Sequence, residues 1–168
     1  MDFNCAQIRQ IADMLNDIGE LELIPRFRAK LPNRAFEKTA SLDDFCEAIQ
    51  TAEQRLYDGL ARLFSGAAVV GEETSAALKH SGQADIAFLF DPIYGTKKIT
   101  SGLPLFEATI AGSRRVEIVL AAIDDSVCNE IALTLRREDS WIAAPNGSSA
   151  MKSSRNFLAG TAPPSLKA

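Results

Sequence analysis

Two acidic residues follow short apolar runs, in positions from which their carboxylates could bind a metal ion. Asp91 comes directly after the apolar residues 86–90, and Glu72 comes shortly after the apolar residues 67–70. An acid at the end of a buried strand projects from the edge of its sheet, so the two carboxylates could meet there. Hard cations such as Mg²⁺ take oxygen ligands. The pattern therefore predicts a candidate Mg²⁺ site.

The residues after Asp91 have the composition of an anion-binding turn. Pro92 stiffens the chain, while Gly95 and Thr96 lack bulk and could open a short helix, whose free amides would accept an anion. The alternatives are a tight turn without a ligand, and two exposed acids, Glu72 and Asp91, at strand ends.

These residues stand in segments that resemble one enzyme family. Asp91–Thr96 reads Asp-Pro-Ile-Tyr-Gly-Thr and resembles the signature Asp-Pro-(Ile/Leu)-Asp-Gly-Thr of the inositol monophosphatases, whose relatives include bacterial histidinol phosphatases. Ala68–Glu73 resembles the family's strand and Gly-Glu-Glu metal motif, and Gly102–Phe106 resembles the segment after its signature. The resemblance runs from the first predicted helix to about Trp141. It implies the N-terminal half of an inositol-monophosphatase-like αβαβα sandwich.

The resemblance also implies a Mg²⁺-dependent phosphatase site with a role for each residue. Glu72 would bind metal and, with Thr96, position the attacking water, and Asp91 would bridge metal ions. The backbone carbonyl of Ile93 would be a further ligand. The amides of Gly95 and Thr96 would hold the phosphate of a small phosphorylated substrate. Such metal ions polarise phosphoryl oxygens and lower the pKa of the attacking water.

Three departures from the family pattern concern this metal site. Tyr94 stands where the signature has a metal-binding Asp, and its phenol, with a pKa near ~10, is neutral at pH 7. The family's Val-Thr-x-x-Asp element aligns near Phe45–Ile49, where its Asp falls on Ile49. The sequence also lacks the family's Trp-Asp-x-Ala-Gly motif, which supplies another metal-binding Asp.

We therefore interpret the chain as a degenerate, truncated inositol-monophosphatase-like domain with little or no phosphatase activity and weak or absent Mg²⁺ binding. The alternative is a working Mg²⁺-dependent phosphomonoesterase, of the inositol monophosphate or histidinol phosphate type, that completes its site with a partner chain. Phosphate release by the purified protein in Mg²⁺ separates the two.

Two helices and a set of short strands are expected to position these residues. Asn4 with Gln7 resembles a capping box, and apolar residues at helical spacing follow until Pro25, which should end or kink the helix. Ser41 opens a second predicted helix, which should stop at Gly66. Short turns imply antiparallel pairing of the strands that follow. The expected class is α+β, with two N-terminal helices packed on a mainly antiparallel sheet. The predicted strands are 67–70, 86–90, 105–111, 116–123 and 130–136.

Length and composition suit one domain. We place it at 1–144, followed by a Pro-, Gly- and Ser-rich tail or truncated element at 145–168. The net charge of -4 argues against a nucleic-acid partner, and no apolar run is long enough for a membrane span. No secretory signal is recognisable, and the 3 cysteines lack metal-ligand spacing, so we expect buried free thiols and a cytoplasmic protein.

The predicted strand 116–123 bears on assembly because both of its faces are largely apolar. The two N-terminal helices can cover only one face of the sheet. We therefore expect a homodimer, or a protein partner, that covers the other face. One face of the strand is expected to carry Val116, Ile118, Leu120 and Ala122, and the opposite face Glu117, Val119, Ala121 and Ile123.

Overall fold

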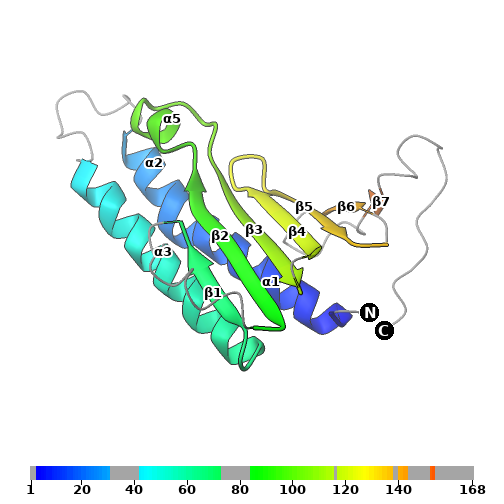
Figure 1. The fold of residues 1–168 in the computed structure, drawn as a ribbon. Coiled ribbons are helices and arrows are strands. Elements are labelled where there is room, and N and C mark those ends of the chain that lie inside the picture. Colours follow the sequence, from blue (N-terminus) through cyan, green and yellow to red (C-terminus); the bar gives the residue numbers. More distant parts are fainter. Residues whose placement is uncertain are drawn as a thin grey trace.

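A layer of helices packs on one face of a seven-stranded sheet (Figure 1). The structure, a computed structural model, describes residues 3–30, 42–72, 84–115, 117–137, 140–143 and 152–153. The helices are α1 (Cys5–Ile18), the π-helical segment η1 (Gly19–Leu23), α2 (Ile24–Lys30), α3 (Leu42–Leu63) and α5 (Thr96–Thr100). The strands are β1 (Ala68–Gly71), β2 (Ile86–Tyr94), β3 (Glu107–Arg114), β4 (Glu117–Asp125), β5 (Glu130–Leu135), β6 (Ser140–Ala143) and β7 (Lys152–Ser153).

The strands lie in the sheet in the order of the sequence. β1 pairs with β2 in parallel, and every later neighbouring pair is antiparallel. The predicted class, α+β with a mainly antiparallel sheet, is therefore confirmed. β7 falls within the predicted tail 145–168 and pairs with β6, so this part of the tail extends the sheet. The other residues of that tail lie outside the described ranges.

The first helix begins with the predicted capping box. The Asn4 backbone N–H donates to Gln7 Oε1, and the Gln7 backbone N–H donates to Asn4 Oδ1, each at 2.9 Å. The helix was expected to end or kink at Pro25. Instead η1 interrupts it after Ile18, and Pro25 sits in the first turn of α2, where a missing N–H is tolerated.

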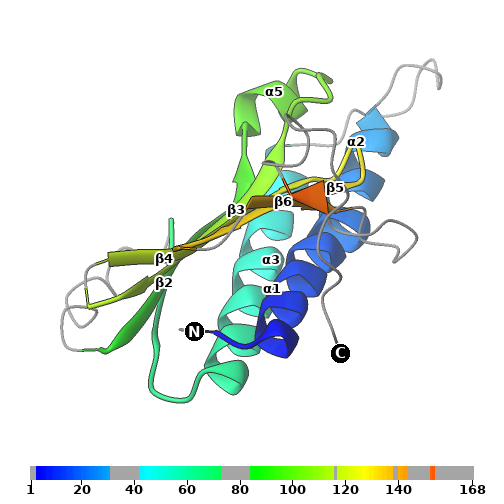
Figure 2. The ribbon, with the colours of Figure 1, turned by 90° about the vertical axis from the view of Figure 1, so that its right-hand side faces the viewer.

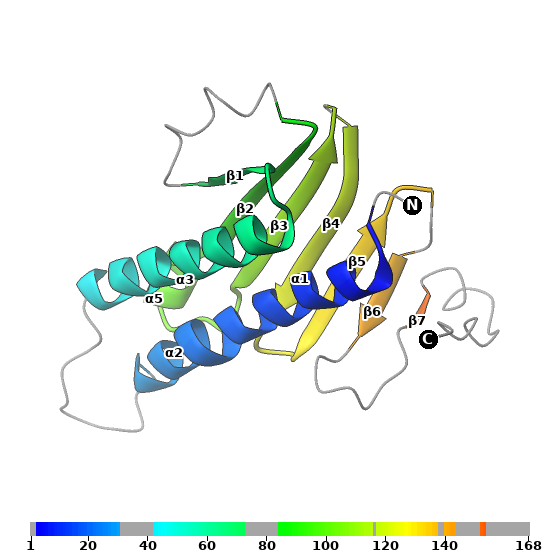
Figure 3. The same ribbon diagram turned by 90° about the horizontal axis from the view of Figure 1, so that it is seen from below.

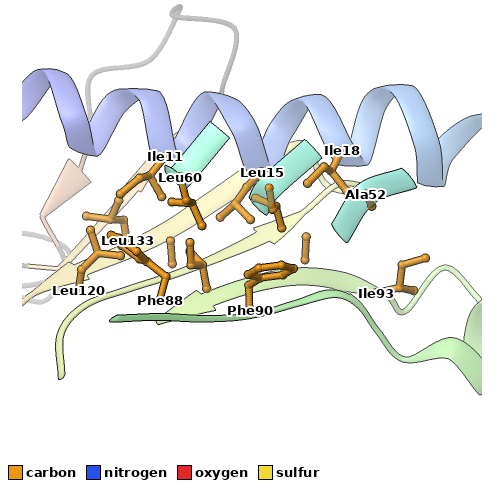
Figure 4. Packing of buried hydrophobic residues seen from close by; sticks show 14 of the residues in the cluster. Ile11, Leu15, Ile18, Ala52, Leu60, Phe88, Phe90, Ile93, Leu120 and Leu133 are labelled. Atoms are coloured by element: carbon orange, nitrogen blue, oxygen red, sulfur yellow. The ribbon is translucent and has the colours of Figure 1, made fainter. Parts of the chain in front are cut away.

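The core lies between the helices and the sheet. Figures 2 and 3 show α1 and α3 side by side across one face of the strands. Side chains from both helices meet Phe88 and Phe90 of β2 (Figure 4). Among the described residues, no helix is long and apolar enough to cross a membrane. The labelled helix residues of this core are Ile11, Leu15, Ile18, Ala52 and Leu60.

The predicted faces of 116–123 are wrong at one point, because β4 contains a bulge. Ile118 lies opposite Ser113 and Leu120 lies opposite Gly112, which leaves Val119 as an extra residue. Val119 and Leu120 are therefore both buried, whereas Ile118 is exposed on the other face. A strict alternation assigned Ile118 to the face of Leu120 and Val119 to the opposite face, and both assignments are wrong. Val116, which was assigned with Ile118, lies outside the described residues.

The expectation of buried thiols is also wrong for two cysteines. Cys46 and Cys128 are exposed. Cys46 lies on the solvent side of α3, and Cys128 lies in the turn between β4 and β5, where no layer covers it. The side chain of Cys5 lies outside the described part of the chain.

Candidate functional site

The parallel pairing of β1 and β2 brings the two predicted acids together. Gly71 lies opposite Phe90, and the backbone N–H of Glu72 donates to the Phe90 carbonyl at 3.1 Å. The next residues along the two strands are Glu72 and Asp91. Because side chains alternate along a strand, Asp91 points away from the core that Phe90 enters.

The two carboxyl groups interact directly. The negative charge of Asp91 raises the pKa of Glu72, and desolvation and a hydrogen bond between the two carboxyl groups raise it further. Asp91 is half-buried and accepts a hydrogen bond from the Ile93 backbone N–H, which is 2.9 Å from its Oδ1. This bond fixes the Asp91 carboxylate beside Glu72. A cation between the carboxylates would relieve their repulsion.

A bulge in β2 follows Asp91 and presents a backbone carbonyl. Asp91 lies opposite Thr109 and Tyr94 lies opposite Glu107, so Pro92 and Ile93 together oppose one residue of β3. Proline suits this position because it has no N–H to contribute to the ladder. The Ile93 carbonyl accepts a hydrogen bond from Thr96 Oγ1 at 3.2 Å. A carbonyl oxygen has two lone pairs, so this bond does not prevent metal ligation.

Gly95 is required by the backbone of the turn. Its φ is +102°, and a Cβ atom there would lie 2.7 Å from the Leu105 carbonyl oxygen. Gly95 is the N-cap of α5, and its carbonyl accepts hydrogen bonds from the N–H groups of Lys98 and Ile99. The short helix expected at Gly95 and Thr96 is therefore present. Their role in phosphate binding stays a prediction.

The two positions where the resemblance implies lost ligands carry no carboxylate. Tyr94 is 58% exposed, and Lys98 Nζ lies 6.0 Å from the centre of its ring. Ile49 is partly buried on α3 and packs against the core. Sequence reasoning missed the contact of Tyr94 with Lys98, because Tyr94 ends β2 and Lys98 lies in α5, so the spacing of a single helix does not link them.

The donor set fits a single hard cation better than a cluster of ions. Glu72, Asp91 and the Ile93 carbonyl would supply oxygen atoms only, which are the ligands that Mg²⁺ prefers. Within the described ranges, no group of three or more His, Cys, Asp or Glu side chains could hold a metal ion. Glu73 lies outside those ranges.

Comparison with known proteins shows the family to which the chain belongs. No curated protein matches the sequence. SuhB from Bartonella henselae shares 18% identity with a TM-score of 0.64, over 90% of this chain and 56% of SuhB. An inositol monophosphatase from Zymomonas mobilis shares 21% identity with a TM-score of 0.63, over 81% of this chain and 50% of that one.

An inositol monophosphatase from Thermotoga maritima shares 21% identity with a TM-score of 0.59, over 84% of this chain and 51% of that one. The chain thus spans about half the length of these solved relatives. A sequence model of the inositol monophosphatase family matches residues 9–165, farther than the resemblance to about Trp141. The chain belongs to the inositol monophosphatase family.

Proposed function

We propose that this chain is a phosphatase-family domain that binds Mg²⁺ weakly and has little or no phosphomonoesterase activity of its own. The observation that carries the proposal is Tyr94, which places an exposed phenol beside Lys98 where the resemblance implies a metal-binding carboxylate. A phenol supplies no carboxylate oxygen, the kind of ligand that Mg²⁺ prefers. Mg²⁺ loses its waters reluctantly, so a site short of anions binds it weakly.

Ile49 supports the same proposal. The resemblance implies a carboxylate at this position, and the side chain present is apolar and packs against the core. Glu53, one turn farther along α3, is buried. It has a partner of its own, so binding a metal ion would require it to change contacts.

The residues present have defined roles if an ion is bound. Glu72, Asp91 and the Ile93 carbonyl would hold it, and the ion would polarise a phosphoryl oxygen and acidify a water molecule. Thr96 holds the Ile93 carbonyl in place through its hydroxyl group. Gly95 allows the backbone to turn toward α5 without a steric clash.

A phosphate-release assay tests the proposal. The purified chain is incubated with Mg²⁺ and either inositol monophosphate or histidinol phosphate, beside a full-length family enzyme. The Glu72→Gln variant is the matched control, because it keeps the size of the side chain and removes its charge. We expect the parent chain and the Glu72→Gln variant to release phosphate equally, at the background rate, while the full-length family enzyme turns over. Turnover that depends on Glu72 would show that the missing carboxylates are dispensable.

The alternative is a phosphomonoesterase whose site is completed by a partner chain. The placement of Asp91 favours it: this residue lies in register with Thr109 and Ile123 on the sheet face opposite the core. Over the described residues, the helices that cross the sheet lie on the other face (Figures 2 and 3). A chain that covered the open face would reach the acids. If the partner is a second copy, specific activity should rise with protein concentration.

A further inference from the structure

A cavity of about 340 Å³ lies at the β3–β4 hairpin, far along the sheet from the two acids. The hairpin pairs with the first residues of β2, since Arg114 lies opposite Ile86, whereas Asp91 is near the other end of that strand. The cavity is therefore separate from the candidate metal site. Its lining residues are Arg114, Arg115, Glu117, Val119 and Arg136.

Three arginines line this cavity, and carboxylates hold each of them. Asp85 accepts hydrogen bonds from Arg114 Nε at 3.0 Å and from Arg115 Nε at 3.1 Å. Arg136 pairs with both carboxylate oxygens of Glu117, and its Nη2 lies 3.0 Å from Oε1. These contacts restrict the side chains before any ligand arrives, which lowers the entropic cost of binding one.

Backbone hydrogen bonds also hold two of these arginines in place. The Arg115 N–H donates to the Asp85 carbonyl at 3.1 Å, and the Arg136 N–H donates to the Val119 carbonyl at 2.9 Å. Arg115 has a φ of +48°, in the left-handed region, so the hairpin turn sets its direction. The bulge that buries Val119 thus also anchors the residue that carries the third guanidinium group.

The charge at this place is opposite to that of the whole chain. Three guanidinium groups face two carboxylates, which leaves one positive charge, whereas the chain carries -4. Arg115 is 85% exposed, and its contact with Asp85 uses one of the five N–H donors of a guanidinium group. The cavity therefore offers directed donors and net positive charge to an anion from solution.

We propose that this cavity binds a phosphate dianion, as inorganic phosphate or as a small phosphomonoester. Guanidinium groups recognise phosphate through paired N–H donors. The three arginines come from three places in the chain: β3, the turn that follows it, and the residue after β5. A tetrahedral phosphate presents oxygens to several directions, whereas a carboxylate presents two in one plane. The site is independent of the proposed function of the acid pair.

Calorimetric titration of the full chain tests this assignment. The probes are inorganic phosphate and glycerol phosphate at constant ionic strength, with EDTA present so that the acid pair holds no metal. We expect saturable binding that Arg115→Gln weakens about tenfold, the loss of one charge-assisted hydrogen bond. Arg9→Gln, which removes an exposed arginine of α1, is the matched control and should bind as the parent does.

Four other results would overturn the assignment. Absence of phosphate binding refutes the site, and equal binding by the parent and Arg115→Gln refutes the role of the arginines. Loss of binding in Thr96→Ala instead would place the phosphate at the turn before α5. Citrate that competes as well as phosphate would refute the ligand class. Binding of inorganic phosphate but not glycerol phosphate supports the site and excludes esters.

Discussion

Tyr94 places a phenol near a cation, at the position where the resemblance implies a carboxylate. The Lys98 ammonium group is 6.0 Å from the ring centre. A carboxylate at this position would add a negative charge near Glu72 and Asp91. We expect Tyr94→Asp to tighten Mg²⁺ binding about tenfold, on the order of 1.4 kcal/mol, without restoring the turnover of a full-length family enzyme. The position of Ile49 stays apolar, and residues that act as a unit contribute non-additively.

Isothermal titration with Mg²⁺ measures this effect, and the phosphate-release assay measures turnover. Tyr57→Asp is the matched control, because Tyr57 is 49% exposed and lies on α3. The control introduces the same charge away from the acid pair and should leave Mg²⁺ affinity unchanged. Submillimolar affinity in the parent chain would contradict the degenerate interpretation, and so would ordinary family turnover in Tyr94→Asp.

Asp124 is a fully buried acid at the end of β4. Its Oδ2 accepts a hydrogen bond from Ser126 Oγ at 2.5 Å, and its Oδ1 has no hydrogen-bond partner within the described part of the chain. Burial raises its pKa to about 6; the Ser126 hydroxyl opposes this rise, while the negative charges of Asp125 and Glu20 add to it. The ionised form is therefore disfavoured in the folded protein.

This pKa predicts how stability changes with pH. A group whose pKa is raised on folding stabilises the protein most below its unfolded pKa, near 3.8, and loses that contribution as pH rises through about 6. The change is on the order of 3 kcal/mol in the free energy of unfolding. We expect Asp124→Asn to flatten the dependence between pH 4 and about 7. Urea unfolding of the parent and the variant across this range measures the effect. If the free energy of unfolding changes with pH equally in both proteins, Asp124 is not the cause of the dependence.

At the scale of elements, Gly19 of η1 packs closely against Asp124 of β4 and against Ser126 in the turn that follows this strand. A Cβ atom on Gly19 would lie 2.1 Å from Ser126 Oγ, 2.7 Å from Ser126 Cβ and 2.8 Å from Asp124 Oδ2. These atoms belong to short side chains that cannot swing away. We expect Gly19→Ala to lower the free energy of unfolding by about 1–3 kcal/mol, as overpacking does.

Gly59→Ala is the matched control for this prediction. A Cβ atom on Gly59 would meet Met14 Sδ at 2.2 Å, near the end of a flexible side chain that can move. Alanine also favours a helix over glycine by about 1 kcal/mol, so this substitution should cost little or stabilise α3. Urea unfolding of the two variants compares them. Equal destabilisation would mean that the close contact of Gly19 with Asp124 and Ser126 is not what makes Gly19→Ala costly.

Periodicity predicted the elements well, and single-residue irregularities escaped it. Apolar spacing gave both N-terminal helices and placed Glu72 and Asp91 at neighbouring strands, because burial on one face leaves a period in the sequence. The predicted strand 86–90 was too short, since β2 runs on through Asp91 to Tyr94. The bulge at Val119 shifts that period by one residue without changing composition. The π-helical segment η1 likewise leaves the apolar spacing of the first helix almost unchanged, so the sequence does not reveal it. The pair of Tyr94 and Lys98 depends on a turn between a strand and a helix, which neither period describes.

At the scale of the whole molecule, one face of the sheet is covered and the other carries exposed apolar side chains. Phe88 and Phe90 enter the core, whereas Leu89 between them is 55% exposed on the opposite face. Ile123 and Ile142 share that face through the register of β4, β5 and β6. Exposed apolar surface is unfavourable by about 25 cal/mol per Å². Covering this face with a second chain would therefore stabilise the complex.

We therefore expect the purified chain to associate through this open face, as a homodimer or with a protein partner. Light scattering over a range of concentrations should show a mass above that of the monomer, and Leu89→Lys should shift the equilibrium toward monomer by placing a charge at the interface. Leu21→Lys is the matched control, since Leu21 is 53% exposed but lies on η1 in the helical layer. It should leave the mass unchanged. A parent chain that is monomeric at every concentration and binds no hydrophobic dye would show that the open face is covered by the chain itself, because bare apolar surface of this kind binds such dyes.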